Sequence, residues 1–125
     1  MNKVALNIWG RQFDLEVEYD CFKNEEILPS QKSALAAFCN AQDAIVISEK
    51  LVEKYCVENN AEEIDATSID NIFKYVIPRY LYVARSKQKH IVAIMCDYRF
   101  DMENGLAVVF ENEKPVKVGV QDIIL

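Results

Sequence analysis

The stretch CDYRFDMENGLAVVFENE, residues 96–113, decides the fold, because apolar residues flank a single glycine, Gly105, on both sides. Its five acidic residues and one arginine leave two interpretations open, a cation-binding loop and a β-hairpin. An EF-hand loop requires glycine at its sixth position. Started at Asp97 the sixth residue is Met102, and started at Asp101 it is Leu106, so both registers fail. The pattern therefore favours the hairpin.

The loop length sets the pairing of the two strands in this hairpin. A two-residue turn at Asn104-Gly105 would place Tyr98 opposite Glu111 and so mix apolar with charged residues. A three-residue loop over 103–105, with Gly105 left-handed, instead predicts one apolar face on which Phe100 lies opposite Val108 and Tyr98 opposite Phe110. We favour the three-residue loop.

This register predicts a cluster of charged side chains on the other face of the hairpin, made up of Asp97, Arg99, Asp101 and Glu111. Carboxylates of directly opposed residues repel each other, so Asp97 facing Glu111 needs compensation by Arg99, by solvent or by a cation. A charged face that is merely solvated is the commoner case. The sharper hypotheses are a protein-binding surface and a metal-binding, catalytic or small-ligand site.

The rest of the chain predicts strands, then helices, then strands. Alternating apolar residues indicate strands over 3–9 and 13–20 around a loop at 10–12. Apolar residues three and four apart indicate a helix capped by Ser30 and, after a break at Asn40 or Asp43, a second one to about Asn59. The further predicted elements are a short helix capped by Ser68 or Asp70 and ending near Val76, strands over 79–85, 91–100 and 106–112, and a last segment from Lys114. The prediction is one α+β domain over 1–125, in ββ-αα(α)-ββββ order. Its antiparallel sheet of five or six strands carries the helices on one face.

A row of carboxylates alternates with the apolar residues of the second strand and consists of Asp14, Glu16, Glu18 and Asp20. We call these four residues the acidic row. One interpretation is a solvated strand face, or a sheet edge kept charged against aggregation. The other is a docking surface for a basic partner. Trp9, the single tryptophan, is predicted either to be exposed beside this row as an interface residue or to pack at the hairpin end.

Composition excludes several classes of function. Fourteen basic against twenty acidic residues give a net charge of −6, which disfavours binding to nucleic acid or to an anionic membrane. The charge is uneven, since residues 71–96 hold five basic residues and no acid. The first residues lack the apolar core of a signal peptide, and the longest apolar run, 91–96, is too short to span a bilayer. We expect a soluble, cytoplasmic protein.

Catalytic and metal-binding motifs are not evident. The four cysteines are widely spaced and there is a single histidine, His90, so we expect reduced, buried thiols and no zinc site. On one strand His90 and Cys96 would lie roughly 20 Å apart, too far for a thiol–imidazole pair. We therefore predict no catalytic residue and no cofactor.

Two sequence patterns resemble a group of small uncharacterised bacterial proteins. One is D-x-E-x-G-x-A-x-x-F, formed here by Asp101, Glu103, Gly105, Ala107 and Phe110, and the other is the tail G-x-Q-D-I-I at 119–124. Small acidic proteins of this sort are similar to immunity proteins of bacterial toxin systems. The resemblance implies a non-enzymatic protein-binding module and carries over no site residue. A self-associating structural protein is a third hypothesis.

Overall fold

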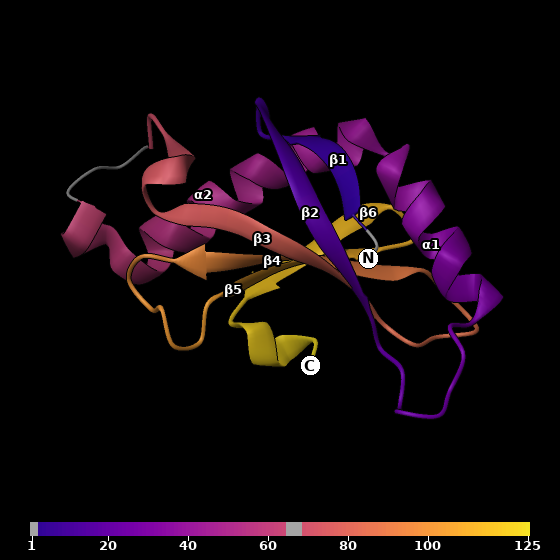
Figure 1. Cartoon of the computed structure of the whole chain (residues 1–125). Coiled ribbons are helices and arrows are strands. Elements are labelled where there is room, and N and C mark those ends of the chain that lie inside the picture. The colour runs from indigo at the N-terminus through magenta and orange to yellow at the C-terminus, as the bar shows by residue number, and fades with distance from the viewer. Residues whose placement is uncertain (1–2, 65–68) are drawn as a thin grey trace.

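The computed structural model describes residues 3–64 and 69–125. It contains a six-stranded sheet whose spatial order is the order of the sequence (Figure 1). The elements are β1 (Lys3–Ile8), β2 (Arg11–Tyr19), α1 (Pro29–Cys39), α2 (Gln42–Ile64), the 3-10 helix η1 (Ile72–Lys74), β3 (Val76–Val83), β4 (Ile91–Tyr98), β5 (Leu106–Glu111), β6 (Lys114–Gly119) and the 3-10 helix η2 (Gln121–Ile123). The predicted α+β class and element order are confirmed.

The sheet is antiparallel except at one junction. β2 and β3 run parallel, with Glu16 opposite Tyr80 and Glu18 opposite Tyr82. Parallel neighbours need a long crossover connection, and α1 and α2 provide it. Because β2 lies between β1 and β3, it is an interior strand, and the interpretation of the acidic row as a charged sheet edge is wrong.

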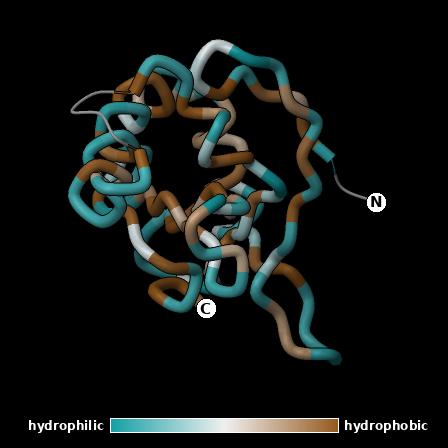
Figure 2. The backbone as a smooth tube through the Cα atoms, turned by 90° about the vertical axis from the view of Figure 1, so that its left-hand side faces the viewer, coloured by the Kyte–Doolittle hydropathy of each residue, from teal (hydrophilic) through white to brown (hydrophobic). Residues whose placement is uncertain are grey.

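Both long helices pack against the same face of the sheet, as predicted (Figure 1). Phe38 of α1 and Ile45 and Val52 of α2 are at most 1% exposed. Their partners in the main core are strand residues on that face, which include Leu6, Ile8, Leu15, Leu81, Val83, Val92, Ile94, Leu106, Val108 and Phe110. Hydrophilic segments follow mainly the outer turns of the helices and the connecting loops (Figure 2).

No long helix of the described residues covers the opposite face of the sheet, and we call it the open face. A second apolar cluster lies there, formed by Tyr82, Ala93, Met95, Ala107 and Val109. Tyr80 and the C-terminal residues Ile123 and Ile124 pack against its border. The open face thus has an apolar centre and leaves β1 and β2 to solvent.

Helix ends differ from the prediction in detail. α1 begins at Pro29, and Ser30 lies inside it, where its hydroxyl donates to the Ser86 carbonyl oxygen at 2.8 Å. The helix start is instead held by Gln31, whose side-chain oxygen accepts the Leu28 N–H at 2.9 Å. Asn40 ends α1 as expected.

The later helix boundaries agree with the prediction in part. Asn60 of α2 has a non-helical φ of −137°, which agrees with a second helix ending near Asn59. Of the two expected caps of the short helix, Ser68 lies outside the described residues and Asp70 is not the cap. Asn71 caps η1 instead by accepting the Phe73 N–H at 3.1 Å.

The predicted register of the β4–β5 hairpin is wrong, although its faces are right. Ile94 lies opposite Val108 and Ile91 opposite Glu111, a displacement of six residues along β4. The β4–β5 ladder ends at the pair Cys96 and Leu106, and β4 continues to Tyr98 against β3 alone. The connection is then held by the Arg99 N–H, which donates to the Tyr75 carbonyl, and the Gly105 N–H, which donates to the Asp101 carbonyl. An even displacement keeps each side chain on its predicted face. The left-handed Gly105, with φ +63°, is confirmed.

Candidate functional site

The acidic row lies on the open face. Asp14, Glu16 and Glu18 are exposed within β2, and Asp20 is exposed just beyond its end. The alternate residues of the strand, such as Leu15, pack into the main core. The first three carboxylates line a shallow hollow of about 340 Å³ together with Lys3, Arg79 and Tyr80. In the part of the chain that the structure describes, no residue of the acidic row forms an ion pair.

Two tyrosines of β3 lie beside this row, and its negative charges contribute to the raised pKa of both phenols. Burial, followed by the negative charges of Asp20 and Glu18, raises the pKa of Tyr82 to about 12. Burial and then Glu18 raise the pKa of Tyr80 as well. Both phenols therefore stay protonated at neutral pH and offer hydroxyl groups next to the carboxylates.

Trp9 is not part of this surface. It is 7% exposed, and its indole Nε1–H donates to the Ser48 hydroxyl of α2 at 3.0 Å. The turn is Trp9-Gly10, with φ of +52° and +89°, rather than the predicted 10–12 loop. A turn residue does not follow strand alternation, so the expectation of an exposed Trp9 is wrong and the packed alternative is confirmed.

The charged cluster predicted on the 97–111 hairpin is not assembled. Asp97 lies opposite Ile77 of β3, not opposite Glu111, and its Oδ2 accepts from Arg79 Nε at 2.6 Å. Glu111 lies at the far end of β4 and β5, where its ion pair with Lys89 lowers its pKa. Within 3–64 and 69–125, no group of three or more His, Cys, Asp or Glu residues is placed to hold a metal ion.

The remaining two members of that cluster have separate surroundings. The Asp101 carboxylate accepts the Asn104 backbone N–H at 3.2 Å and its side-chain amide at 3.1 Å, which closes the connection between β4 and β5. Arg99 is exposed, and the ion pairs of the described residues do not include it. The geometry thus explains Asp101 as a turn residue.

The two sequence patterns on which the resemblance rests meet in space. Gln121 of the tail donates its side-chain N–H to the Cys96 carbonyl at 3.1 Å, and its backbone N–H donates to the Asn104 carbonyl at 3.1 Å. A Cβ on Gly105 would lie 2.6 Å from Gln121 Nε2 and 2.9 Å from the Cys96 oxygen. The patterns are therefore a structural clasp that holds the C-terminus on the sheet.

A family model described as a domain of unknown function, DUF6985, matches residues 1–125. The chain belongs to the DUF6985 family. This agrees with the expected uncharacterised family and carries no statement about immunity proteins. No curated protein and no solved structure matches the chain.

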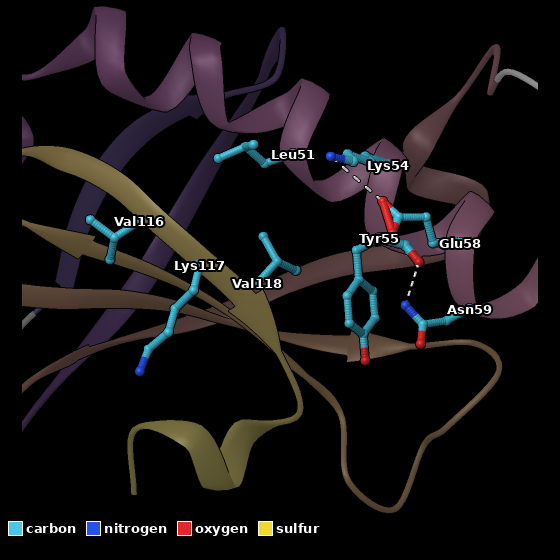
Figure 3. Close-up of a pocket in the computed structure, with 8 residues that line it drawn as sticks. All are labelled: Leu51, Lys54, Tyr55, Glu58, Asn59, Val116, Lys117 and Val118. Carbon is cyan, nitrogen blue, oxygen red and sulfur yellow. Dashed lines mark hydrogen bonds and ion pairs between the residues drawn. The ribbon is translucent and has the colours of Figure 1, made fainter.

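This DUF6985 domain has a further hollow of about 240 Å³ between α2 and β6, which the sequence did not indicate (Figure 3). Leu51, Tyr55 and Val118 point into it, whereas Lys117 points away. Its polar groups are engaged with one another, because Lys54 pairs with Glu58 at 3.8 Å and the Asn59 amide donates to the Tyr55 carbonyl at 2.8 Å. The charged side chains of Lys54 and Glu58 are thus engaged with each other rather than available to a ligand.

The thiols and the histidine of the DUF6985 domain have surroundings that fit structural roles. All four cysteines lie in the described ranges and are free thiols. Burial raises the pKa of Cys56 to about 11, so this thiol remains protonated and unreactive. His90 Nδ1 lies 2.8 Å from a Glu113 carboxylate oxygen at the turn between β5 and β6.

A second charged surface matches no sequence motif. The excess of basic residues over 71–96 is the only feature of the sequence that indicates it. Lys74, Arg79 and Arg99 line a hollow of about 240 Å³ with Tyr75, Ile77, Asp97 and Met102. We call it the basic pocket. The structure brings Arg99 here from the connection after β4, which the sequence order alone did not reveal.

Proposed function

We propose that this DUF6985 domain is a non-enzymatic protein-binding module whose acidic row docks a basic partner protein. The observation that carries the proposal is the row of exposed carboxylates on the open face, which form no ion pair with any residue in 3–64 or 69–125. Side chains on one face of a strand repeat about every 6.8 Å, so these four like charges repel one another. Lys3, which lies opposite Glu16 on β1, compensates only one of them. Lys or Arg side chains of a partner would relieve that repulsion.

Electrostatics also sets the kind of binding. A row of one sign attracts an opposite patch over about a Debye length, which raises the association rate more than the final affinity. The neighbouring Tyr80 is half-buried and adds an aromatic surface with a protonated hydroxyl. Aromatic residues are enriched where protein interfaces are strongest. We expect fast, salt-sensitive binding.

The alternative function, a metal or small-ligand site at Asp97, Asp101 and Glu111, gains no support from any observation in the described residues. The register that would have brought Asp97 and Glu111 together is not the observed one. The immunity-like form of the binding function, with a toxin as the partner, remains part of our proposal and rests on the sequence resemblance. Its cytoplasmic location rests on composition. Among the described helices, none is long and apolar enough to cross a membrane.

The experiment is a low-salt pulldown with the immobilised domain. The test variant carries Asp14→Asn, Glu16→Gln, Glu18→Gln and Asp20→Asn, and the control carries Glu58→Gln, Glu62→Gln, Glu63→Gln and Asp70→Asn, the same charge change at exposed residues elsewhere. We expect a specific basic protein to be retained by the wild type and the control and lost by the test variant. Equal retention by both variants would refute the proposal.

A further inference from the structure

The basic pocket lies on the open face at one end of the sheet. Asp97 is two residues from Met95 of the second apolar cluster, so it shares the open face, and it pairs with Arg79. Lys74 and Arg99 are exposed and form no ion pair with any described residue. The pocket thus holds three cations against one carboxylate, in a chain whose net charge is −6.

The basic pocket and the hollow at the acidic row are neighbours. Arg79 lines both of them, and Tyr80 follows it in β3. Two surfaces of opposite charge therefore lie side by side on one face. Neither is fully neutralised from within, because the hollow holds three carboxylates against Lys3 and Arg79, and Arg79 is already paired with Asp97. In the basic pocket, Lys74 and Arg99 lack an ion pair with any described residue.

We infer that the partner of the acidic row is a second copy of this chain, bound about a twofold axis close to Arg79 and Tyr80. About a twofold axis, a patch on one side of the axis in one copy faces the patch on the other side of the axis in the second copy. An acidic row beside a basic pocket is then self-complementary, since each row faces the other copy's pocket. This inference rests on the proposed function, and it assigns the basic surface that docks on the row to the basic pocket of a second copy instead of to a toxin.

Apolar side chains lie beside Arg79, near the proposed axis. Tyr80 and Ile77 are half-buried, and Met102 at the edge of the basic pocket is 64% exposed. A flexible methionine adapts to a partner surface at little cost. An apolar centre with a charged rim is the usual anatomy of a protein interface. Two chains of net charge −6 repel at a distance, so pairing of the acidic row with the basic pocket has to outweigh that repulsion at close range.

Sedimentation equilibrium of the full chain tests the inference first. We expect a mass that rises toward twice the 14.4 kDa of one chain as the concentration increases. Wild type that stays monomeric up to about 1 mM overturns the inference. A control variant with Glu58→Lys and Glu62→Lys should dimerise like wild type, because these residues lie on α2.

A charge swap tests the pairing itself. One variant carries Glu16→Lys and Glu18→Lys, and the other carries Lys74→Glu and Arg99→Glu. Each alone has two surfaces of the same sign and should be at least tenfold weaker as a dimer, whereas an equimolar mixture should restore dimers that contain one chain of each. Variants that still dimerise alone, or a mixture that fails to pair, contradict the twofold arrangement.

The two proposals fail in different ways. A monomeric wild type that still captures a basic protein through the acidic row refutes the self-pairing and leaves the binding function standing. A monomer whose captured proteins do not depend on the row refutes both.

Discussion

Gly105 is the residue on which the C-terminal clasp depends. Its φ of +63° is a left-handed conformation, and Cys96 and Gln121 occupy the space where a Cβ would lie. Gly10 offers a matched comparison, because its φ is +89° but nothing lies within 4 Å of its Cβ position. The two glycines therefore separate backbone strain from steric contact.

Gly105→Ala should lower the free energy of unfolding by about 2–4 kcal/mol, since left-handed strain of about 1–2 kcal/mol adds to a clash with the Cys96 carbonyl. Gly10→Ala should cost about 1–2 kcal/mol, the strain alone. Urea unfolding followed by the fluorescence of Trp9, the single tryptophan, measures both. Equal losses of unfolding free energy in the two variants would show that a Cβ on Gly105 causes no steric clash with Cys96 and Gln121.

Single residues were predicted well where a local rule decides them, and poorly where a distant contact does. Gly105 was assigned its left-handed conformation from the turn alone. Trp9 required knowledge of Ser48, which is 39 residues away and accepts its indole N–H. Ser30 was a reasonable cap by residue type, yet the Gln31 side chain performs that role.

At the scale of elements, Gln31 joins α1 to the ends of two strands. It is 1% exposed, and its amide N–H groups donate to the Asp20 carbonyl at 3.1 Å and the Val83 carbonyl at 3.3 Å. β2 and β3 are parallel neighbours here, so one side chain closes the crossover. Nothing in the periodicity of the helix marks this residue.

Gln31→Ala should destabilise the fold by about 2–4 kcal/mol, because it leaves buried carbonyls without donors and opens a cavity. Gln42→Ala at the exposed start of α2 is the control and should change stability by less than about 0.5 kcal/mol. Chemical denaturation at neutral pH compares them. A loss below about 1 kcal/mol for Gln31→Ala would contradict the stabilising role of the Gln31 hydrogen bonds to Asp20 and Val83.

The ion pair of Lys89 with Glu111 makes the β4–β5 ladder sensitive to acid. Lys89 lowers the pKa of the Glu111 carboxyl below its ordinary value of 4.5. A carboxyl whose pKa is depressed by folding stabilises the native state above its unfolded pKa. That stabilisation is lost as the pH falls through the folded value.

The stability difference between wild type and Glu111→Gln should therefore be greatest at neutral pH and shrink as the pH drops below 4.5. Unfolding curves collected between neutral and acidic pH give this difference directly. Lys89→Met removes the same pair from the other side and should show the same trend. A difference that does not vary with pH would exclude the pair as its cause.

Strand patterns predicted the elements because period-two alternation is local. They could not predict the register of β4 against β5, since the connection between the two strands is held by Tyr75, more than twenty residues earlier. The prediction of a carboxylate cluster at Asp97 and Glu111 depended on that register and is therefore wrong as well. The acidic row did not depend on register, because alternation alone places its residues on one face.

At the scale of the whole molecule, helices protect one face of the sheet and leave the other partly open. Cys56 and Cys96 are both 0% exposed and belong to the main core between the two layers. Burial raises the pKa of both thiols. A reagent that attacks thiolates can reach them only when the layers separate.

A variant with Cys21→Ser and Cys39→Ser keeps only these two buried thiols. Their reaction with Ellman's reagent at pH 8 should accelerate with urea along the same slope as global unfolding, because no smaller opening exposes them. In wild type, the half-buried Cys21 and Cys39 should react first. A weaker urea dependence would instead indicate local opening, for which the non-helical Asn60, four residues from Cys56, is the nearest weak point. Because Tyr98 donates its hydroxyl to the Asn60 side chain and thereby ties this break to β4, we expect the two layers to separate together.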